Sequence, residues 1–225
     1  METVIAIGVL AVLLTSFMAV FGPASAQLRK AISVQEADRL VGSLDREMTT
    51  VRPGTESTYT TGFDKGYQWI LDSSKAAKAI LLYQYRGNPA KMRSDGSMEP
   101  YTKNNGTAGR DFVVQPMVRQ RDDQQLQDDL KALDGPIYTV KLNQLVFNNG
   151  QMEEGKEGEI VATDPSSGGA SSGSGSDGYP DATIAFEAEF YIVPNSSIEY
   201  VQAGGKFDPT KLTKPIFTNN MAIRR

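Results

Sequence analysis

The chain has 225 residues and a formal net charge of −4, and it contains neither Cys nor His. The lack of Cys excludes disulfides, thiolate nucleophiles and zinc–thiolate sites. The lack of His removes the commonest general base and the commonest transition-metal ligand. No basic surface suited to nucleic acid is expected at this net charge. Composition therefore favours a structural or binding role over an enzymatic one, with no cofactor and no metal site.

The first predicted element is an apolar helix. Residues 4–21 contain no charged residue and no Pro, so the stretch is long enough to cross a hydrocarbon core as a helix. A cleaved secretory signal is the alternative, because Ala24, Ser25 and Ala26 form an A-x-A pattern. However, the front of the chain is acidic and the apolar stretch is long for a signal. We therefore assign residues 1–23 to an uncleaved transmembrane segment.

The charges that flank this segment are placed unusually. Arg29 and Lys30 follow it and Glu2 precedes it, whereas Lys and Arg normally mark the cytoplasmic flank. Either the bulk of the protein is cytoplasmic, or a basic segment that belongs before Glu2 is missing from the sequence. We expect the second, with Met1 an internal codon and a short basic leader encoded upstream.

The helix is predicted to continue beyond the membrane, with Pro23 bending it but not ending it. Apolar residues recur at steps mostly of three and four: Leu28, Ile32, Ala37, Val41, Leu44, Met48 and Val51. Charged residues fill the other face: Arg29, Lys30, Glu36, Asp38, Arg39, Asp45, Arg46 and Glu47. Residues 24–52 therefore form an amphipathic half. Its apolar stripe needs a partner, which is the chain's own head, other copies of the chain, or both.

This beginning resembles that of a known family. An acid followed at once by an apolar helix with an early Gly8, then by an amphipathic half and a head, is similar to the type IV pilins and the pseudopilins of type II secretion. The resemblance covers about the first fifty residues, and nothing in the head carries it. The chain departs from the family pattern because the leader, its Gly and the residues between the cleavage point and the glutamate are not present before Met1 and Glu2.

The resemblance implies a non-enzymatic subunit that assembles into a filament. It implies partners: other pilin or pseudopilin subunits, a prepilin peptidase that cleaves and methylates, and the inner membrane before assembly. Glu2 would pair with the terminal amine of a neighbouring copy, which is consistent with the cost of an unpaired carboxylate near hydrocarbon. The head would lie outside the inner membrane, in the periplasm or on a surface filament. The stripe residues Val41, Leu44 and Met48 are predicted to contact neighbouring subunits in addition to the head.

Two other classes remain open. One is a single-pass anchored binding protein whose head recognises a ligand without polymerising. The other is a secreted enzyme released after Ala26, for which no catalytic group is evident in the sequence.

Residues 53–225 are predicted to form an α+β head, an antiparallel sheet packed on the long helix. We expect helices at 63–78, which includes Trp69, and at 122–133, and strands at 79–85, 112–118 (broken by Pro116), 137–147, 160–161, 183–193 and 215–223. Residues 86–110 are expected to be a long loop, and the Ser/Gly-rich residues 165–178 a mobile loop. The acids Asp122, Asp123, Asp128 and Asp129 are expected to lie on a solvated helix face.

Overall fold

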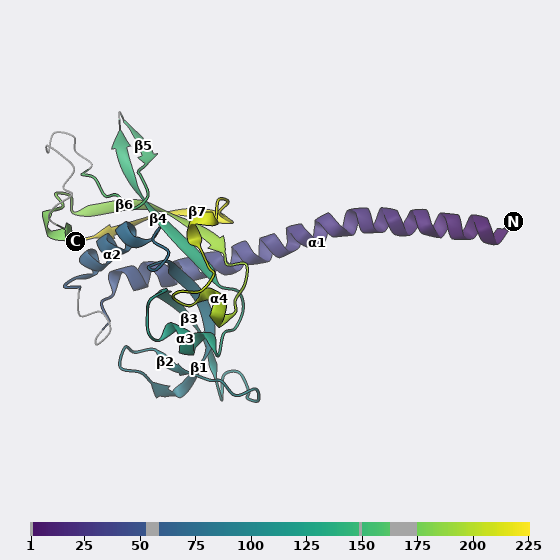
Figure 1. Cartoon of the computed structure of the whole chain (residues 1–225), viewed down its shortest axis with the longest axis horizontal. Helices are drawn as coiled ribbons and strands as arrows, with labels where there is room; N and C mark the ends of the chain where they lie inside the picture. The colour runs from purple at the N-terminus through teal and green to yellow at the C-terminus, as the bar shows by residue number, and fades with distance from the viewer. Residues whose placement is uncertain (1, 53–58, 149, 163–174) are drawn as a thin grey trace. The chain divides into compact units, whose positions relative to one another are not determined.

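The computed structural model describes residues 2–52, 59–148, 150–162 and 175–225. It divides into two compact units, Met1–Asp38 and Arg39–Arg225, and each is considered by itself (Figure 1). The predicted boundaries lay at residues 23 and 52, whereas the units divide within the amphipathic half. We call the second unit, Arg39–Arg225, the head.

A single helix, α1, runs over Glu2–Thr49. Pro23 lies inside α1, so the helix continues through it, as predicted from the sequence. Pro removes one backbone N–H from the helix ladder, a loss that a long helix can absorb as a local bend. Residues 39–49 of α1 belong to the head, and Val51 follows the helix end.

The head is an α+β unit with a seven-stranded sheet in which every pair of neighbouring strands is antiparallel, which confirms the predicted fold class. Its strands are β1 (Ile80–Met92), β2 (Met98–Pro100), β3 (Val113–Gln120), β4 (Tyr138–Asn148), β5 (Gln151–Glu154), β6 (Thr183–Ile192) and β7 (Phe217–Arg224). Its other helices are α2 (Gly62–Asp72), α3 (Leu126–Leu130), α4 (Ile198–Val201), and the 3-10 helices η2 (Gly175–Gly178) and η3 (Pro209–Lys211). The strand order is β2-β1-β4-β6-β7, with β3 paired to β1 and β5 paired to β4.

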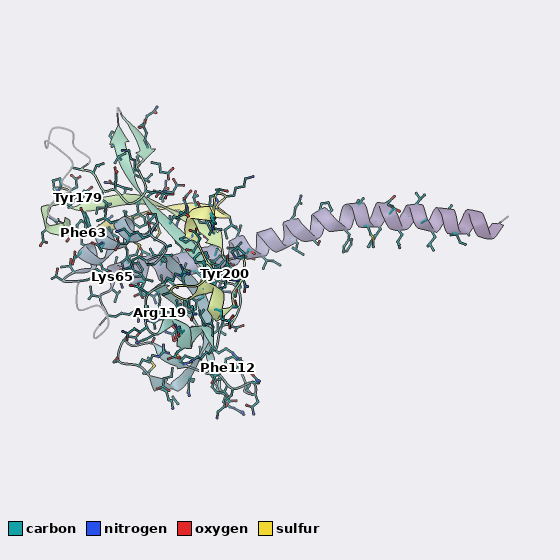
Figure 2. The ribbon with its side chains drawn as sticks, viewed as in Figure 1. Phe63, Lys65, Phe112, Arg119, Tyr179 and Tyr200 are labelled. Atoms are coloured by element: carbon teal, nitrogen blue, oxygen red, sulfur yellow. The ribbon has the colours of Figure 1, made fainter. Side chains whose placement is uncertain are left out.

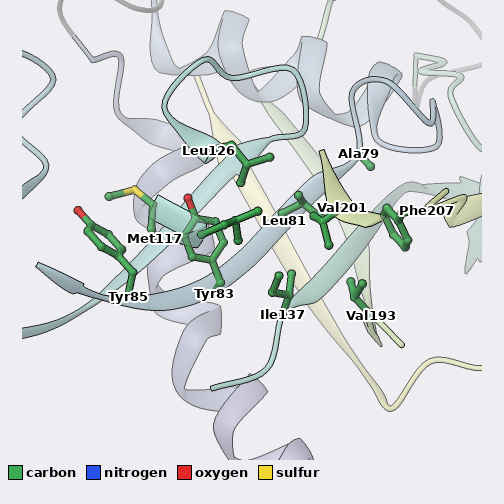
Figure 3. Close-up of a cluster of buried hydrophobic side chains, with 11 residues drawn as sticks. Ala79, Leu81, Tyr83, Tyr85, Met117, Leu126, Ile137, Val193, Val201 and Phe207 are labelled. Atoms are coloured by element: carbon green, nitrogen blue, oxygen red, sulfur yellow. The ribbon is translucent and has the colours of Figure 1, made fainter. Parts of the chain in front are cut away.

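Both faces of the sheet are apolar over part of their area. On one face, Val140 of β4 lies opposite Phe190 of β6, and Ile223 of β7 lies opposite Ile184. Alternate residues of β1 point to the other face, where Leu81 and Tyr83 join Leu126 of α3 and Val201 of α4 in a buried cluster (Figure 3). The alternation Ile184, Phe186, Ala188, Phe190 that predicted a strand is fully buried, as expected of a core-facing row.

Helix α2 and the end of α1 pack together. A Cβ on Gly66 of α2 would lie 2.6 Å from Ile223 Cδ1, so a side chain here would require Ile223 of β7 to shift. A Cβ on Gly62 would collide with the carbonyl oxygen of Thr49, the last residue of α1. Leu40, Leu44 and Met48 of α1 are buried in the head. The helix therefore enters the hydrophobic core with its last three turns.

Several predicted boundaries need correction. Helix α2 ends at Asp72 and not at 78, and α3 covers only Leu126–Leu130 of the predicted 122–133. The predicted loop 86–110 is wrong in part, because β1 continues to Met92 and β2 follows it. Polar residues occupy these strands since this end of β1 is exposed. Ile160 and Val161 are not in a strand, and β5, which was not predicted, follows β4 in a hairpin.

Pro116 does not break β3, contrary to the prediction. The N–H of Arg121 donates to the carbonyl of Ala79, and the register between β1 and β3 is regular, so odd-numbered residues of β3 face β1. Pro116 therefore turns its missing donor to the outer edge of β3, where no ladder bond is lost.

The Ser/Gly-rich stretch lies mostly outside the described residues. Only its end, η2, is described, and there Ser176 is buried and its hydroxyl donates to Asp64 Oδ1 of α2 at 2.8 Å. This end of the stretch is thus packed on the head, in contrast to the mobile loop predicted for it.

Candidate functional site: an apolar helix and a buried ionic network

The first candidate site is the apolar part of α1. In the part of the chain that the structure describes, one segment, Ala6–Ser25, is long and apolar enough to cross a membrane, and none of it is buried. Its large side chains are all well exposed: Ile7, Val9, Leu10, Val12, Leu13, Leu14, Phe17, Met18, Val20 and Phe21. A continuous apolar surface of this size is unfavourable in water and matches the hydrocarbon interior of a bilayer.

The few polar side chains of this segment are satisfied within the helix. The hydroxyl groups of Thr15 and Ser16 donate to the carbonyl oxygens of Ala11 and Val12, and the hydroxyl of Ser25 donates to Gly22. Such bonds to the preceding turn remove the cost of exposing a hydroxyl to hydrocarbon. Phe17 and Phe21 stack with ring centroids 4.6 Å apart. The segment is therefore compatible with lipid on every side.

The structure separates the four predicted assembly residues. Glu2 begins α1, and its side chain lies outside the described part. Leu44 and Met48 are fully buried in the head, and Val41 is half-buried. Leu44 and Met48 therefore contact the head of their own chain. Of the stripe residues Val41, Leu44 and Met48, only Val41 keeps surface for a direct contact with a neighbouring subunit, and that contact stays a prediction.

The second candidate site is a buried ionic network that begins at Glu47. The sequence placed Glu47 on the polar face of α1, but it is buried between the turns that carry Leu44 and Met48. Its Oε1 accepts a hydrogen bond from Lys65 Nζ of α2 at 2.8 Å, and both its oxygens accept from Arg52. Lys65, labelled in Figure 2, is fully buried, and its Nζ also lies 4.7 Å from the ring centroid of Trp69.

Arg52 connects this group to a second one. Its Nη1 donates to the carbonyl oxygen of Asp95, in the turn between β1 and β2, at 3.0 Å. The Asp95 carboxylate in turn accepts from Arg119 of β3 at 3.1 Å, and Arg119 also donates to Asp129 of α3 at 2.8 Å. The network thus ties the end of α1 to α2, to the β1–β2 turn, to β3 and to α3.

Asp129 is the centre of the second group and corrects another prediction. It was expected on a solvated helix face, yet it is fully buried. Its carboxylate accepts from the hydroxyl of Tyr83 at 2.7 Å and from Arg93 at 2.6 Å, in addition to Arg119. Asp128 is exposed on α3, as predicted, whereas Asp122 is exposed but precedes the helix, and Asp123, also before it, is half-buried beside Arg119.

The pKa shifts follow from this geometry. Burial by itself raises the pKa of Glu47, but the hydrogen bonds and positive charges of Arg52 and Lys65 outweigh it, so the pKa lies below its usual value. The same balance holds for Asp95, where burial is outweighed by the hydrogen bonds from Ser97 and by Arg119. Burial, with the negative charge of Asp129, raises the pKa of Tyr83 well above its usual value. Glu47 and Asp95 are thus held ionised, and the phenol of Tyr83 is held neutral.

Chemically, the network is a set of mutually satisfied ion pairs. Four cations, Arg52, Lys65, Arg93 and Arg119, face four carboxylates, Glu47, Asp95, Asp123 and Asp129. In the described residues, no group of three or more His, Cys, Asp or Glu side chains is arranged to hold a metal ion. The ion pairs of Glu47 with Arg52 and Lys65 fix the end of α1 in the head. Sequence reasoning missed the network, and the only signal was a glutamate at position 47 between two core residues.

Comparisons of the chain with known protein families, with curated proteins and with solved structures found no match. Function therefore has to be inferred from the two sites themselves.

Proposed function

We propose that the chain is a membrane-anchored structural subunit of the pilin or pseudopilin kind, which assembles into a filament through α1. The observation that carries this proposal is that one continuous helix is charge-free and exposed over Ala6–Ser25 and has its last turns buried in a folded head. A helix of this kind is stable only where hydrocarbon or other copies of the same surface cover its apolar half.

Two coverings are available to the same surface at different times. Before assembly, the bilayer covers Ala6–Ser25. In a filament, the apolar halves of neighbouring copies cover one another, and these helix contacts replace the lipid contacts at little cost in free energy. The ionic network contributes by fixing α1 in the head, so that a force applied to the helix is transmitted to the head. Glu2, at the start of the helix, would then pair with a cationic group of the next copy.

The anchored binding protein is the main competing class, because it shares the membrane segment and differs only in polymerisation. A direct experiment is to wash membranes that contain the full chain with alkaline carbonate, extract the protein in detergent, remove the detergent, and look for filaments by sedimentation and electron microscopy. We expect the protein to resist the wash and to form filaments. Release by the wash would exclude anchoring, and retention without any polymer would favour the binding protein.

Two matched substitutions test the role of Glu2 in the same assay. Glu2→Leu removes the carboxylate at the start of the helix, and Asp38→Leu removes an exposed carboxylate further along α1. Both variants should remain in the washed membrane. We expect Glu2→Leu to reduce the yield of filaments at least about tenfold, since a buried ion pair loses one partner, and Asp38→Leu to leave it unchanged. Equal yields from the two variants would refute the pairing.

A further inference from the structure

Strand β4 carries a buried polar side chain whose hydrogen bonds are incomplete. Asn143 is 2% exposed, and its Nδ2 donates to Glu154 Oε1 of β5. Within the described residues, no group donates a hydrogen bond to its Oδ1. An unsatisfied buried acceptor is costly, so this oxygen indicates a hydrogen-bond donor that the described residues do not supply.

The unpartnered oxygen is turned toward β6. The carbonyl of Gln144 accepts from the residue that follows β5, and the carbonyl of Ile137 accepts from the residue that follows β6. Successive carbonyls of a strand point to opposite edges, so β5 and β6 flank opposite edges of β4 (Figure 1). An amide holds its nitrogen and its oxygen on opposite sides of Cγ. Since Nδ2 is turned to Glu154 on the β5 side, Oδ1 is turned to the β6 side, where Glu187 lies directly opposite Asn143.

The surroundings of this oxygen are rich in acceptors. Glu187 and Glu189 of β6 are half-buried on the same face of the sheet, and β7 places only uncharged residues opposite them. Lys141 lies directly opposite Glu189, but its Nζ donates to Glu157 and to the carbonyl oxygen of Leu212. In the described part of the chain, neither Glu187 nor Glu189 belongs to an ion pair.

The electrostatics of this face show a shortage of positive charge. Burial raises the pKa of Glu189 above its usual value, and the negative charges of Glu154 and Glu187 add to the rise. The hydroxyl of Tyr191, which donates to Glu189, offsets only part of it. The carboxylates repel one another, so a cation bound among them would be attracted by all three.

We propose that Asn143, Glu187 and Glu189 form a binding site for a primary ammonium group, which we call the ammonium site. Asn143 and Glu187 are cross-strand partners and Glu189 is the diagonal neighbour, so all three side chains reach a common point on this face. The site belongs to the head alone and adds a binding activity that does not depend on the proposed function.

The arrangement of acceptors favours an ammonium over other cations. An ammonium carries three donors on one compact atom, which matches one amide oxygen and two carboxylates that come from two strands. A guanidinium is a planar fork suited to a single carboxylate. A metal ion is a poorer match, since the described residues contain no group of three acidic side chains arranged to hold one.

Methylammonium chloride is the probe that tests the site on the full chain in detergent. Tetramethylammonium chloride is the matched control, because it carries the same charge and has no N–H to donate. We expect methylammonium to raise the unfolding midpoint in a saturable manner, followed by the fluorescence of Trp69, and tetramethylammonium at equal ionic strength to leave it unchanged. Equal effects of the two salts, or no saturable effect of methylammonium, would overturn the proposal.

Two substitutions locate the binding. Glu187→Gln keeps the size of the side chain and removes its charge, and it should weaken the affinity for methylammonium at least about tenfold. Glu199→Gln, at an exposed carboxylate of α4, is the control and should bind as the native chain does. If both variants bind with the same affinity, the diffuse charge of the head and not the ammonium site explains the binding, and the proposal is wrong.

The ammonium group has two possible sources, a small free amine and a lysine side chain of another copy, and sedimentation of the chain in detergent separates them. A lysine source predicts association that rises with protein concentration and falls on addition of methylammonium or in Glu187→Gln. Association that neither change affects, or a chain that stays monomeric, assigns the site to a free amine.

The failure of this inference and the failure of the proposed function are distinguishable. Filaments from a chain that does not bind methylammonium would overturn the ammonium site and leave the assembly through α1 standing. Saturable binding that Glu187→Gln weakens, without any filament, would support the site and count against the filament function.

Discussion

Lys65 Nζ lies 2.8 Å from Glu47 Oε1, and both side chains are buried. This pair joins α2 to the last turn of α1. Because a buried charge is costly unless it is paired, each residue requires the other. The pair therefore determines how the end of the long helix is held in the head.

Removing the cation should destabilise the head strongly. In Lys65→Met, Glu47 keeps only Arg52 as a partner, and we expect the free energy of unfolding to fall by about 3 kcal/mol. Lys131→Met is the matched control, because Lys131 pairs with Asp128 at the surface, and it should cost less than about 1 kcal/mol. The fluorescence of Trp69, the single Trp of the chain, reports unfolding of the full chain in detergent. Equal losses in the two variants would contradict the role of the buried pair.

The stability of the head should fall in acid. The pKa values of Glu47 and Asp95 are lowered in the folded chain from ordinary values of 4.5 and 3.8. A lowered pKa contributes stability that is fully present above the ordinary value and is lost as the pH falls through the folded value. We therefore expect no change from these two groups above about pH 5.5 and a progressive loss below the ordinary pKa of Glu47.

The variant Glu47→Gln isolates one of these groups. It should be less stable than the native chain at neutral pH, because Lys65 then stays buried without its anion, and its loss of stability in acid should be less steep. The measurement is the unfolding midpoint followed between pH 3 and pH 7. A decline as steep as that of the native chain would show that Glu47 is not involved.

Patterns local to the sequence predicted much of the fold, and pairings between distant residues were missed. The alternation in β6 repeats every second residue and the stripe through Leu44 and Met48 follows the helical repeat of about 3.6 residues, so both patterns were visible in the sequence. Glu47 and Asp129 were placed in solvent because their partners, Lys65 and Arg119, belong to other elements. Burial of a charge depends on such partners, which no local pattern contains.

The same limit explains the strands that were missed or misjudged. The far end of β1 was predicted as loop because its residues are polar, but its backbone pairs with β3 up to Gly87 and with β2 from Gly87 to Met92. Pro116 was predicted to break β3. Its effect depends on which edge of the strand its missing N–H faces, and the sequence alone does not show which edge is paired. The candidate membrane segment needed no tertiary information, because its signal is length and composition alone.

Two substitutions on the stripe should separate folding from assembly. Leu44→Asp places a charge without a partner at a fully buried site and should cost about 4 kcal/mol or more, enough to unfold the head. Val41→Asp, at a half-buried site, should cost about 1 kcal/mol and leave the head folded. If α1 carries subunit contacts at Val41, this second variant should fold normally and form fewer filaments. Normal filament yield from Val41→Asp would show that the stripe serves only the head.

The most direct test of the filament proposal is the intact mass of the protein in material sheared from cells that produce it, examined together with electron micrographs of the same material. We predict filaments whose subunit mass includes the whole Ala6–Ser25 segment. A soluble protein whose mass corresponds to a chain beginning at Gln27, with no filaments in the micrographs, would contradict the proposal and leave a secreted protein in its place.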